Sequence, residues 1–179
     1  NEIPFNKLET IKYYKVAIDK GNDMAMNGYA LMLTDGDGVL VNKEEAVKYY
    51  KMAADKGNSN AMNGYAYMIR HSEGIQFNKE EATKYYKMSA EKGNPMGMNN
   101  YAFILENGDG VPMNKDEAAK YYKMAIDKGN TLAMYNYGLM LESGYKSSNV
   151  NEDAIQYFRM ASNKGHEAST QKLKNLGLL

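Results

Sequence analysis

The stretch YYKMAADKGNSNAMNGYAYMI at residues 49–69 recurs along the chain at a constant spacing of 36 residues. Its central pair Gly57-Asn58 has four counterparts at that spacing: Gly21-Asn22, Gly93-Asn94, Gly129-Asn130 and the degenerate Gly165-His166. A constant period of this length is typical of a solenoid, in which each repeat packs only on its neighbours. The sequence therefore predicts a stack of similar units.

Each repeat predicts two helices. The first, helix A, spans about residues 58–71 in the second full repeat. The second, helix B, begins at NKEEA (42–46), where Asn42 is the expected N-cap and Glu45 completes a capping box. It ends at Lys56, with Gly57 at the left-handed C′ position. The fold class expected from these signals is all-α, with about ten helices arranged as antiparallel pairs.

The apolar spacing indicates which sides of the helices are buried. The residues expected inside helix A are Ala25, Met26, Tyr29, Ala30 and Leu33, and those inside helix B are Ala46, Tyr49, Tyr50 and Ala53. Two series of methionines recur with the repeat: Met26, Met62, Met98 and Met134 on helix A, and Met52, Met88, Met124 and Met160 on helix B. Both series are predicted to be core.

The repeats divide the chain into one array. A half repeat at 1–20 contains helix B only, full repeats follow at 21–56, 57–92, 93–128 and 129–164, and a degenerate capping half repeat occupies 165–179. Lys172 and Lys174 suit a solvent-facing cap. The first helix B carries Tyr13 and Val16, side chains that a preceding helix A would cover. The chain is therefore expected to be part of a longer protein.

The combined pattern resembles the Sel-one-like repeat family, a relative of the tetratricopeptide repeat. The match in one unit runs through Ala25, Tyr29-Ala30, Leu33, Gly36-x-Gly38-Val39, Asn42, Ala46, Tyr49-Tyr50, Ala53-Ala54 and Gly57. The chain departs from the family with Tyr-Ala for Leu-Gly, Asn for the capping Asp, and Glu for the Lys of Lys-Ala.

The resemblance implies a right-handed α-α superhelical solenoid that serves as a protein-binding scaffold or adaptor. Some bacterial members are linked to β-lactam binding or hydrolysis, but they are cysteine-rich, and this chain has no cysteine. That activity is therefore not carried over.

A partner is expected to bind the A-helix side that faces away from the core, which lines the concave groove in tetratricopeptide-like solenoids. The residues predicted there are Asn27, Leu31, Asn63, Tyr67, Arg70, His71, Asn99, Phe103, Tyr135 and Leu139. Asn27, Asn63 and Asn99 would form a ladder of amides for the backbone of an extended peptide, beside apolar pockets. The alternative is a structural component held in a larger assembly by its convex face or edges.

Other functions find little support in the composition. The two histidines, His71 and His166, lie in different repeats without a nucleophile nearby in the pattern, so no enzymatic activity and no cofactor are predicted. The turn TDGDGV (34–39) fails the calcium-loop template, and it is interpreted as a hinge between helices. With 22 basic and 22 acidic residues, the charge balance does not favour nucleic acid.

No apolar run reaches the roughly 18 residues of a membrane-spanning helix, so no direct membrane insertion is predicted. The absence of an N-x-Ser/Thr site favours a cytoplasmic location. The predicted partner is therefore a protein or a peptide.

Overall fold

The computed structural model describes residues 5–71, 75–145 and 150–179. Within those residues the chain forms ten helices and no strand. They are α1 (Phe5–Asp19), α2 (Asp23–Asp35), α3 (Lys43–Asp55), α4 (Ser59–His71), α5 (Lys79–Glu91), α6 (Pro95–Asn107), α7 (Lys115–Asp127), α8 (Thr131–Glu142), α9 (Val150–Asn163) and α10 (Glu167–Asn175). The predicted all-α fold of 36-residue helix pairs is confirmed, with α2, α4, α6, α8 and α10 as A helices.

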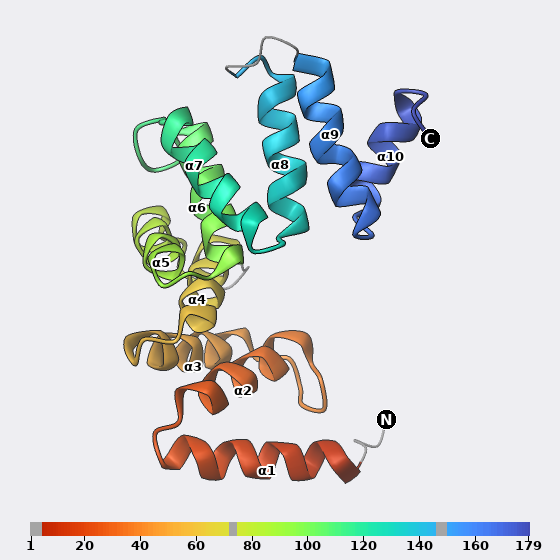
Figure 1. Cartoon of the computed structure of the whole chain (residues 1–179). Helices are drawn as coiled ribbons and strands as arrows, with labels where there is room; N and C mark the ends of the chain where they lie inside the picture. The colour runs from red at the N-terminus through yellow and green to blue at the C-terminus, as the bar shows by residue number, and fades with distance from the viewer. Residues whose placement is uncertain (1–4, 72–74, 146–149) are drawn as a thin grey trace. The chain divides into compact units, whose positions relative to one another are not determined.

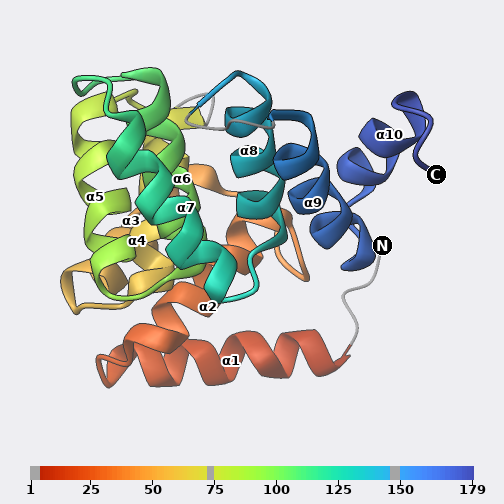
Figure 2. The same ribbon diagram turned by 45° about the horizontal axis from the view of Figure 1, so that its top comes forward.

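The helices group into two compact units, Asn1–Gly93 and Asn94–Leu179, which we call unit 1 and unit 2. The division falls at a Gly-Asn repeat junction. Unit 1 contains α1 to α5 and unit 2 contains α6 to α10, and within each unit an A helix packs beside the B helix that follows it (Figures 1 and 2). Each unit thus buries its apolar faces between helix pairs.

The start of helix B is fixed by its asparagine cap, as predicted. The side-chain oxygen of Asn42 accepts a hydrogen bond from the Glu45 amide at 3.1 Å. The Asn42 amide nitrogen in turn donates to the Glu45 carboxylate at 3.1 Å, so the two side chains bond each other in addition to the backbone. The same pair of bonds recurs at Asn78 and Asn114. Such a cap is worth about 1 kcal/mol.

The end of helix B is fixed by its glycine. Gly57 has φ of 97°, the left-handed region that a Cβ makes costly. Its amide bonds to the Ala54 carbonyl at 2.9 Å, and the next amide, of Asn58, bonds to the Ala53 carbonyl at 3.1 Å. These two bonds form a Schellman motif, which closes helix B and turns the chain toward the next helix A.

The cores of both units consist of small residues facing methionine and tyrosine. All five residues predicted inside α2 are buried, as are Ala46, Tyr50 and Ala53 of α3, while Tyr49 is half-buried. The helix A methionines are also core: Met26, Met62, Met98 and Met134. Alanine at the contact positions lets the helix axes approach closely enough for these long side chains to interlock.

The helix B methionines are not core, so that prediction was wrong. Met52 is 45% exposed and Met160 is also exposed, while Met88 and Met124 are half-buried. Met52 lies about 100° around the helix from Ala53, because an α-helix has 3.6 residues per turn. That rotation places Met52 outside the arc that faces helix A, and its recurrence reflects the repeat rather than burial.

The turn TDGDGV joins α2 to α3, as interpreted from sequence. Gly36 and Gly38 have φ of 74° and 78°, and Asp37 forms an ion pair with Lys7 of α1. Val39 is half-buried. The acids and glycines of this segment therefore serve the backbone and a neighbouring helix.

Candidate functional site

The A-helix face of unit 1 is the outward side of α2 and α4. It carries two apolar side chains at corresponding positions, Leu31 at 51% exposed and Tyr67 at 53% exposed. Asn27 and Asn63 are half-buried beside them. The six residues predicted for this face in unit 1 thus lie on one side of two helices, with Arg70 half-buried and His71 exposed at the end of α4.

Tyr67 and His71 form a ring pair on that face. Their ring centroids are 4.8 Å apart with an interplanar angle of 38°. The two residues are one helical turn apart, the spacing at which helix side chains meet. The exposed tyrosine is therefore held in position before any partner binds, which lowers the entropic cost of binding.

A recess opens beside Leu31 between α1 and α2. It has a volume of about 400 Å³, and its lining includes Tyr14, Gly28, Leu31 and Asp35. A Cβ at Gly28 would lie 2.7 Å from the Tyr14 hydroxyl oxygen. Glycine at this position is thus required for the tyrosine to lie against α2, and the tyrosine in turn forms one wall of the recess.

The A-helix face of unit 2, on α6 and α8, is more closed. Phe103 is 47% exposed, whereas Tyr135 and Leu139 are less exposed than Phe103 and are half-buried. Tyr135 packs on Phe158 and His166, with centroid distances of 5.8 and 5.0 Å. This predicted binding residue is held in contacts within its own unit.

The predicted ladder of amides does not continue to Asn99, which is 2% exposed. Its side-chain oxygen accepts a hydrogen bond from Asn136 at 3.0 Å, and its nitrogen donates to Asn100 at 3.1 Å. Asn136 stands where the repeat places Gly64 in unit 1. The extra amide binds Asn99, and the role predicted for Asn99 as a groove residue is corrected on that ground.

A polar contact closes unit 2 further. Tyr122 of α7 donates a hydrogen bond from its hydroxyl to Glu106 of α6 at 2.8 Å. Burial raises the pKa of the Glu106 carboxyl, although the bond from Tyr122 lowers it. In the next repeat the tyrosine is replaced by Phe158, and the corresponding acid, Glu142, pairs with Lys172 of α10 at 2.8 Å.

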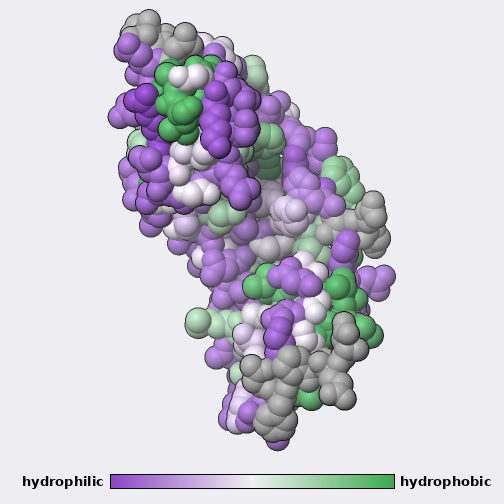
Figure 3. Space-filling view, turned by 90° about the vertical axis from the view of Figure 1, so that its right-hand side faces the viewer, coloured by the Kyte–Doolittle hydropathy of each residue, from purple (hydrophilic) through white to green (hydrophobic). Residues whose placement is uncertain are grey.

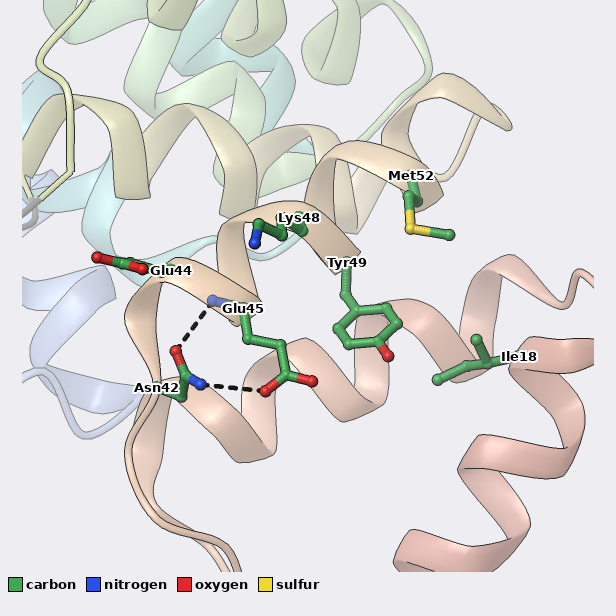
Figure 4. A pocket seen from close by; sticks show the side chains of 7 residues that line it. All are labelled: Ile18, Asn42, Glu44, Glu45, Lys48, Tyr49 and Met52. Atoms are coloured by element: carbon green, nitrogen blue, oxygen red, sulfur yellow. Dashed lines mark hydrogen bonds between the residues drawn. The ribbon is translucent and has the colours of Figure 1, made fainter.

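The outer face of the B helices holds a second kind of recess, which the sequence analysis did not anticipate. One of about 450 Å³ lies between α1 and α3, lined by Ile18, Asn42, Glu44, Glu45, Lys48, Tyr49 and Met52. Figure 4 shows Tyr49 and Met52 of α3 on the side of the recess facing Ile18, and the Asn42–Glu45 cap at its other end. Met124 and Met160 line similar recesses beside α7 and α9. The incomplete burial of Met52, Met124 and Met160 was the signal for these recesses.

The lysines of the B helices are engaged locally. Lys51 forms an ion pair with Asp55 at 2.7 Å and lies 5.3 Å from the centre of the Tyr85 ring. The bond to Asp55 raises the pKa of Lys51, and the bond from Lys51 lowers the pKa of Asp55. Lys87 pairs with Glu91 at 3.9 Å. A row of lysines matched by acids on the same helix has little net attraction for a polyanion.

The described part of the chain offers no metal-binding cluster. Residues 5–71, 75–145 and 150–179 hold no group of three or more His, Asp or Glu side chains that would bind a metal ion. His166 is the N-cap of α10, accepting from the Ser169 amide at 3.3 Å, as its position at a helix start predicted. None of the helices in these ranges is long and apolar enough to cross a membrane.

The repeat register agrees with a known family model. The model described as Sel1 repeat matches residues 23–58, 59–94, 95–130 and 131–166. The chain belongs to the Sel1 repeat family. A comparison with curated proteins finds no match. Sel1 repeat proteins are generally protein-interaction scaffolds, and their solenoid fold is typically non-catalytic.

Solved structures share this fold. A Sel1 repeat protein from Oxalobacter formigenes matches with a TM-score of 0.83 and 25% identity, over 95% of this chain and 69% of its own. A protective antigen from uropathogenic Escherichia coli with an SLR fold matches with a TM-score of 0.77 and 24% identity, over 93% of this chain and 36% of its own. The cysteine-rich protein B of Helicobacter pylori matches with a TM-score of 0.59 and 18% identity, over 74% and 96% of the two chains. The chain spans only about a third of the length of the E. coli protein.

Proposed function

We propose that this Sel1 repeat protein is a non-catalytic adaptor that binds a peptide or a partner's segment on the A-helix face of unit 1. The observation that carries the proposal is the pair of half-exposed apolar side chains, Leu31 and Tyr67, at the same position of successive A helices. A tyrosine in a partly enclosed surface is suited to act as an anchor for a partner, and Leu31 adds apolar area at the equivalent position.

Amides complete the surface. Asn27 and Asn63 stand four residues before Leu31 and Tyr67, so each amide lies one helical turn from an apolar anchor. An amide side chain offers both a donor and an acceptor to the backbone of an extended peptide. We infer that the peptide places alternate apolar side chains near Leu31 and Tyr67 while its backbone bonds the asparagines.

A mixed surface supports binding without aggregation. On the face of the molecule seen in Figure 3, apolar side chains lie in separate green patches among a largely hydrophilic surface. Exposed apolar groups in such patches, rimmed by polar ones, are typical of interaction sites.

The test is a selection of peptides from a display library against the full chain, followed by titration by calorimetry. The double variant Asn63→Ala and Tyr67→Ala is expected to weaken binding at least tenfold, about 1.4 kcal/mol, with unchanged helicity by circular dichroism. The matched control is Phe103→Ala, which removes an equally exposed aromatic from unit 2. Unchanged affinity in the double variant, or an equal loss in the control, would contradict the proposal.

A second candidate function uses the B-helix face, where the protein would be a structural component of a larger assembly. The exposed Met52 beside its 450 Å³ recess favours it, because methionine adapts to partners of different shape. Reversing the charge of Lys51, Lys87 and Lys123 would then disrupt assembly and leave peptide binding intact. Co-purification of the assembly with this triple variant distinguishes the two functions.

A further inference from the structure

The first helix, α1, exposes a surface that the later B helices pack against the helix A before them. On those helices a tyrosine packs edge-to-face on a helix A tyrosine 20 residues earlier in the chain. The four pairs are Tyr29–Tyr49, Tyr65–Tyr85, Tyr101–Tyr121 and Tyr137–Tyr157, with ring centroids 4.8 to 5.1 Å apart and interplanar angles of 76° to 82°. The corresponding residue of α1 is Tyr13, which is 63% exposed, whereas Tyr85 is 7% exposed and the other three B-helix tyrosines are half-buried.

The neighbours of Tyr13 repeat the same difference. Thr10 is exposed where the later B helices have alanines that are at most 1% exposed: Ala46, Ala82, Ala118 and Ala154. Ala17 is half-buried where Ala53 is fully buried. Small side chains one turn either side of a tyrosine are what allow a helix A backbone to approach. The surface formed by Glu9, Thr10, Tyr13 and Ala17 therefore has the shape of a helix seat, and we call it the α1 seat.

The polar group of the seat also corresponds to an established contact. In the second repeat, the Tyr65 hydroxyl donates to Glu81 at 3.0 Å while its ring packs on Tyr85. Glu9 occupies the position of Glu81 in α1, and there it accepts a hydrogen bond from Tyr13 at 3.1 Å. A tyrosine arriving at the seat would thus find both its ring contact and its acceptor already placed.

We propose that the α1 seat binds an A-type helix of a Sel1 repeat, one that carries a tyrosine followed by alanine. Continuity with the four internal interfaces specifies the chemistry of that helix.

A second copy of this chain is a poorer occupant. Its unpaired A helix would be α10, in which Lys174 stands at the position of Ala30, Ala66, Ala102 and Gly138. Those small residues are fully buried, and a Cβ on Gly138 would lie 2.6 Å from the Phe158 ring. A lysine cannot occupy that space against α1.

The test extends the full chain in register. Residues 57–74 are copied in front of Ile3 in place of Asn1 and Glu2, which reconstructs a helix A and its link. Hydrogen exchange followed by mass spectrometry is expected to show α1 amides exchanging at least tenfold more slowly than in the unextended chain, with α10 unchanged. The matched control carries Tyr65→Asp in the copied segment only, and it should return α1 to its original rate.

Three outcomes would overturn the proposal. One is an extension that exchanges as an unstructured tail, and another is equal protection of α1 in the control. The third is self-association of the unextended chain, measured by sedimentation equilibrium and abolished by Tyr13→Asp, which would make a second copy the occupant. Because the seat lies on α1 and the proposed peptide surface on α2 and α4, either proposal can fail while the other holds.

Discussion

The A-helix faces of the two units share one register but present different surfaces. In unit 1, Gly28 and Gly64 leave room for the B-helix tyrosines, and Leu31 and Tyr67 stand out from the face. In unit 2 the positions of the two glycines hold asparagines, Asn99 is buried beneath Asn136, and Tyr135 packs within the unit. A few substitutions at equivalent positions therefore decide whether a repeat offers an open surface or a closed one.

The largest expected effect comes from making unit 1 resemble unit 2. In Gly64→Asn, the new Cβ would lie 2.7 Å from the Tyr50 ring, so the ring or the helix must shift. Overpacking of this kind costs about 1–3 kcal/mol, more than the roughly 0.3 kcal/mol gained when asparagine replaces a helical glycine. We expect a net loss of about 2 kcal/mol in the free energy of unfolding by urea. Wild-type stability in this variant would show that the glycine does not hold the face open.

The reciprocal change opens unit 2. Asn136→Gly removes the donor to the buried Asn99 and places a glycine within α8. The lost bond and the helical glycine together should cost about 1–2 kcal/mol in urea unfolding. Asn27→Gly, which changes the same residue type within α2, is the control for placing a glycine in a helix. Equal losses in the two variants would mean that the Asn136–Asn99 bond contributes nothing.

The third comparison removes one tyrosine hydroxyl from each unit. Tyr122→Phe leaves the half-buried Glu106 without its 2.8 Å donor, and should cost about 1–2 kcal/mol. In unit 1 the neutral Thr34 stands at the position of Glu106, so Tyr50→Phe leaves no charged group without a donor and should cost less, under about 1 kcal/mol. Thermal unfolding of both variants measures the difference. The reverse order would indicate that the charge of Glu106 is satisfied elsewhere.

Glu106 should also make stability depend on pH, and this effect is expected to be smaller than those of the substitutions above. Burial raises the pKa of Glu106 above its ordinary value of 4.5. The unfolded chain then releases this proton at lower pH than the native protein, so the contribution to stability is complete below 4.5 and falls as pH rises toward the native pKa. Glu106→Gln should flatten that part of the profile, measured by urea unfolding between acid and neutral pH. An unchanged profile would contradict the assignment.

Most of the fold could be predicted from sequence because the repeats impose their own register. Asn42, Gly57 and the alanines of both helices act through backbone geometry and close contact, which are local consequences of residue type. The helix B methionines were assigned wrongly because recurrence shows that a position is equivalent in every repeat, and leaves open on which side of the helix it lies. Met52 falls outside the buried arc by its rotation from Ala53.

The candidate site was harder to predict than the fold. Leu31, Tyr67 and Phe103 were placed on an exposed side correctly, since the neighbouring helix positions are core. The burial of Asn99 depends on a contact with the next A helix, through Asn136, and no property of α6 alone indicates it. The recess at Met52 likewise depends on how far α1 stands from α3, which periodicity does not specify.

The most direct measurement is photo-crosslinking to a peptide selected on the full chain. A benzophenone amino acid replaces Tyr67 on the A-helix face of unit 1 in one protein, and Met52 on the B-helix face in another; both sites are about half-exposed. The account predicts that the peptide crosslinks to position 67 and that excess unlabelled peptide abolishes the product. Crosslinking at position 52 instead of 67 would contradict it and assign binding to the B helices.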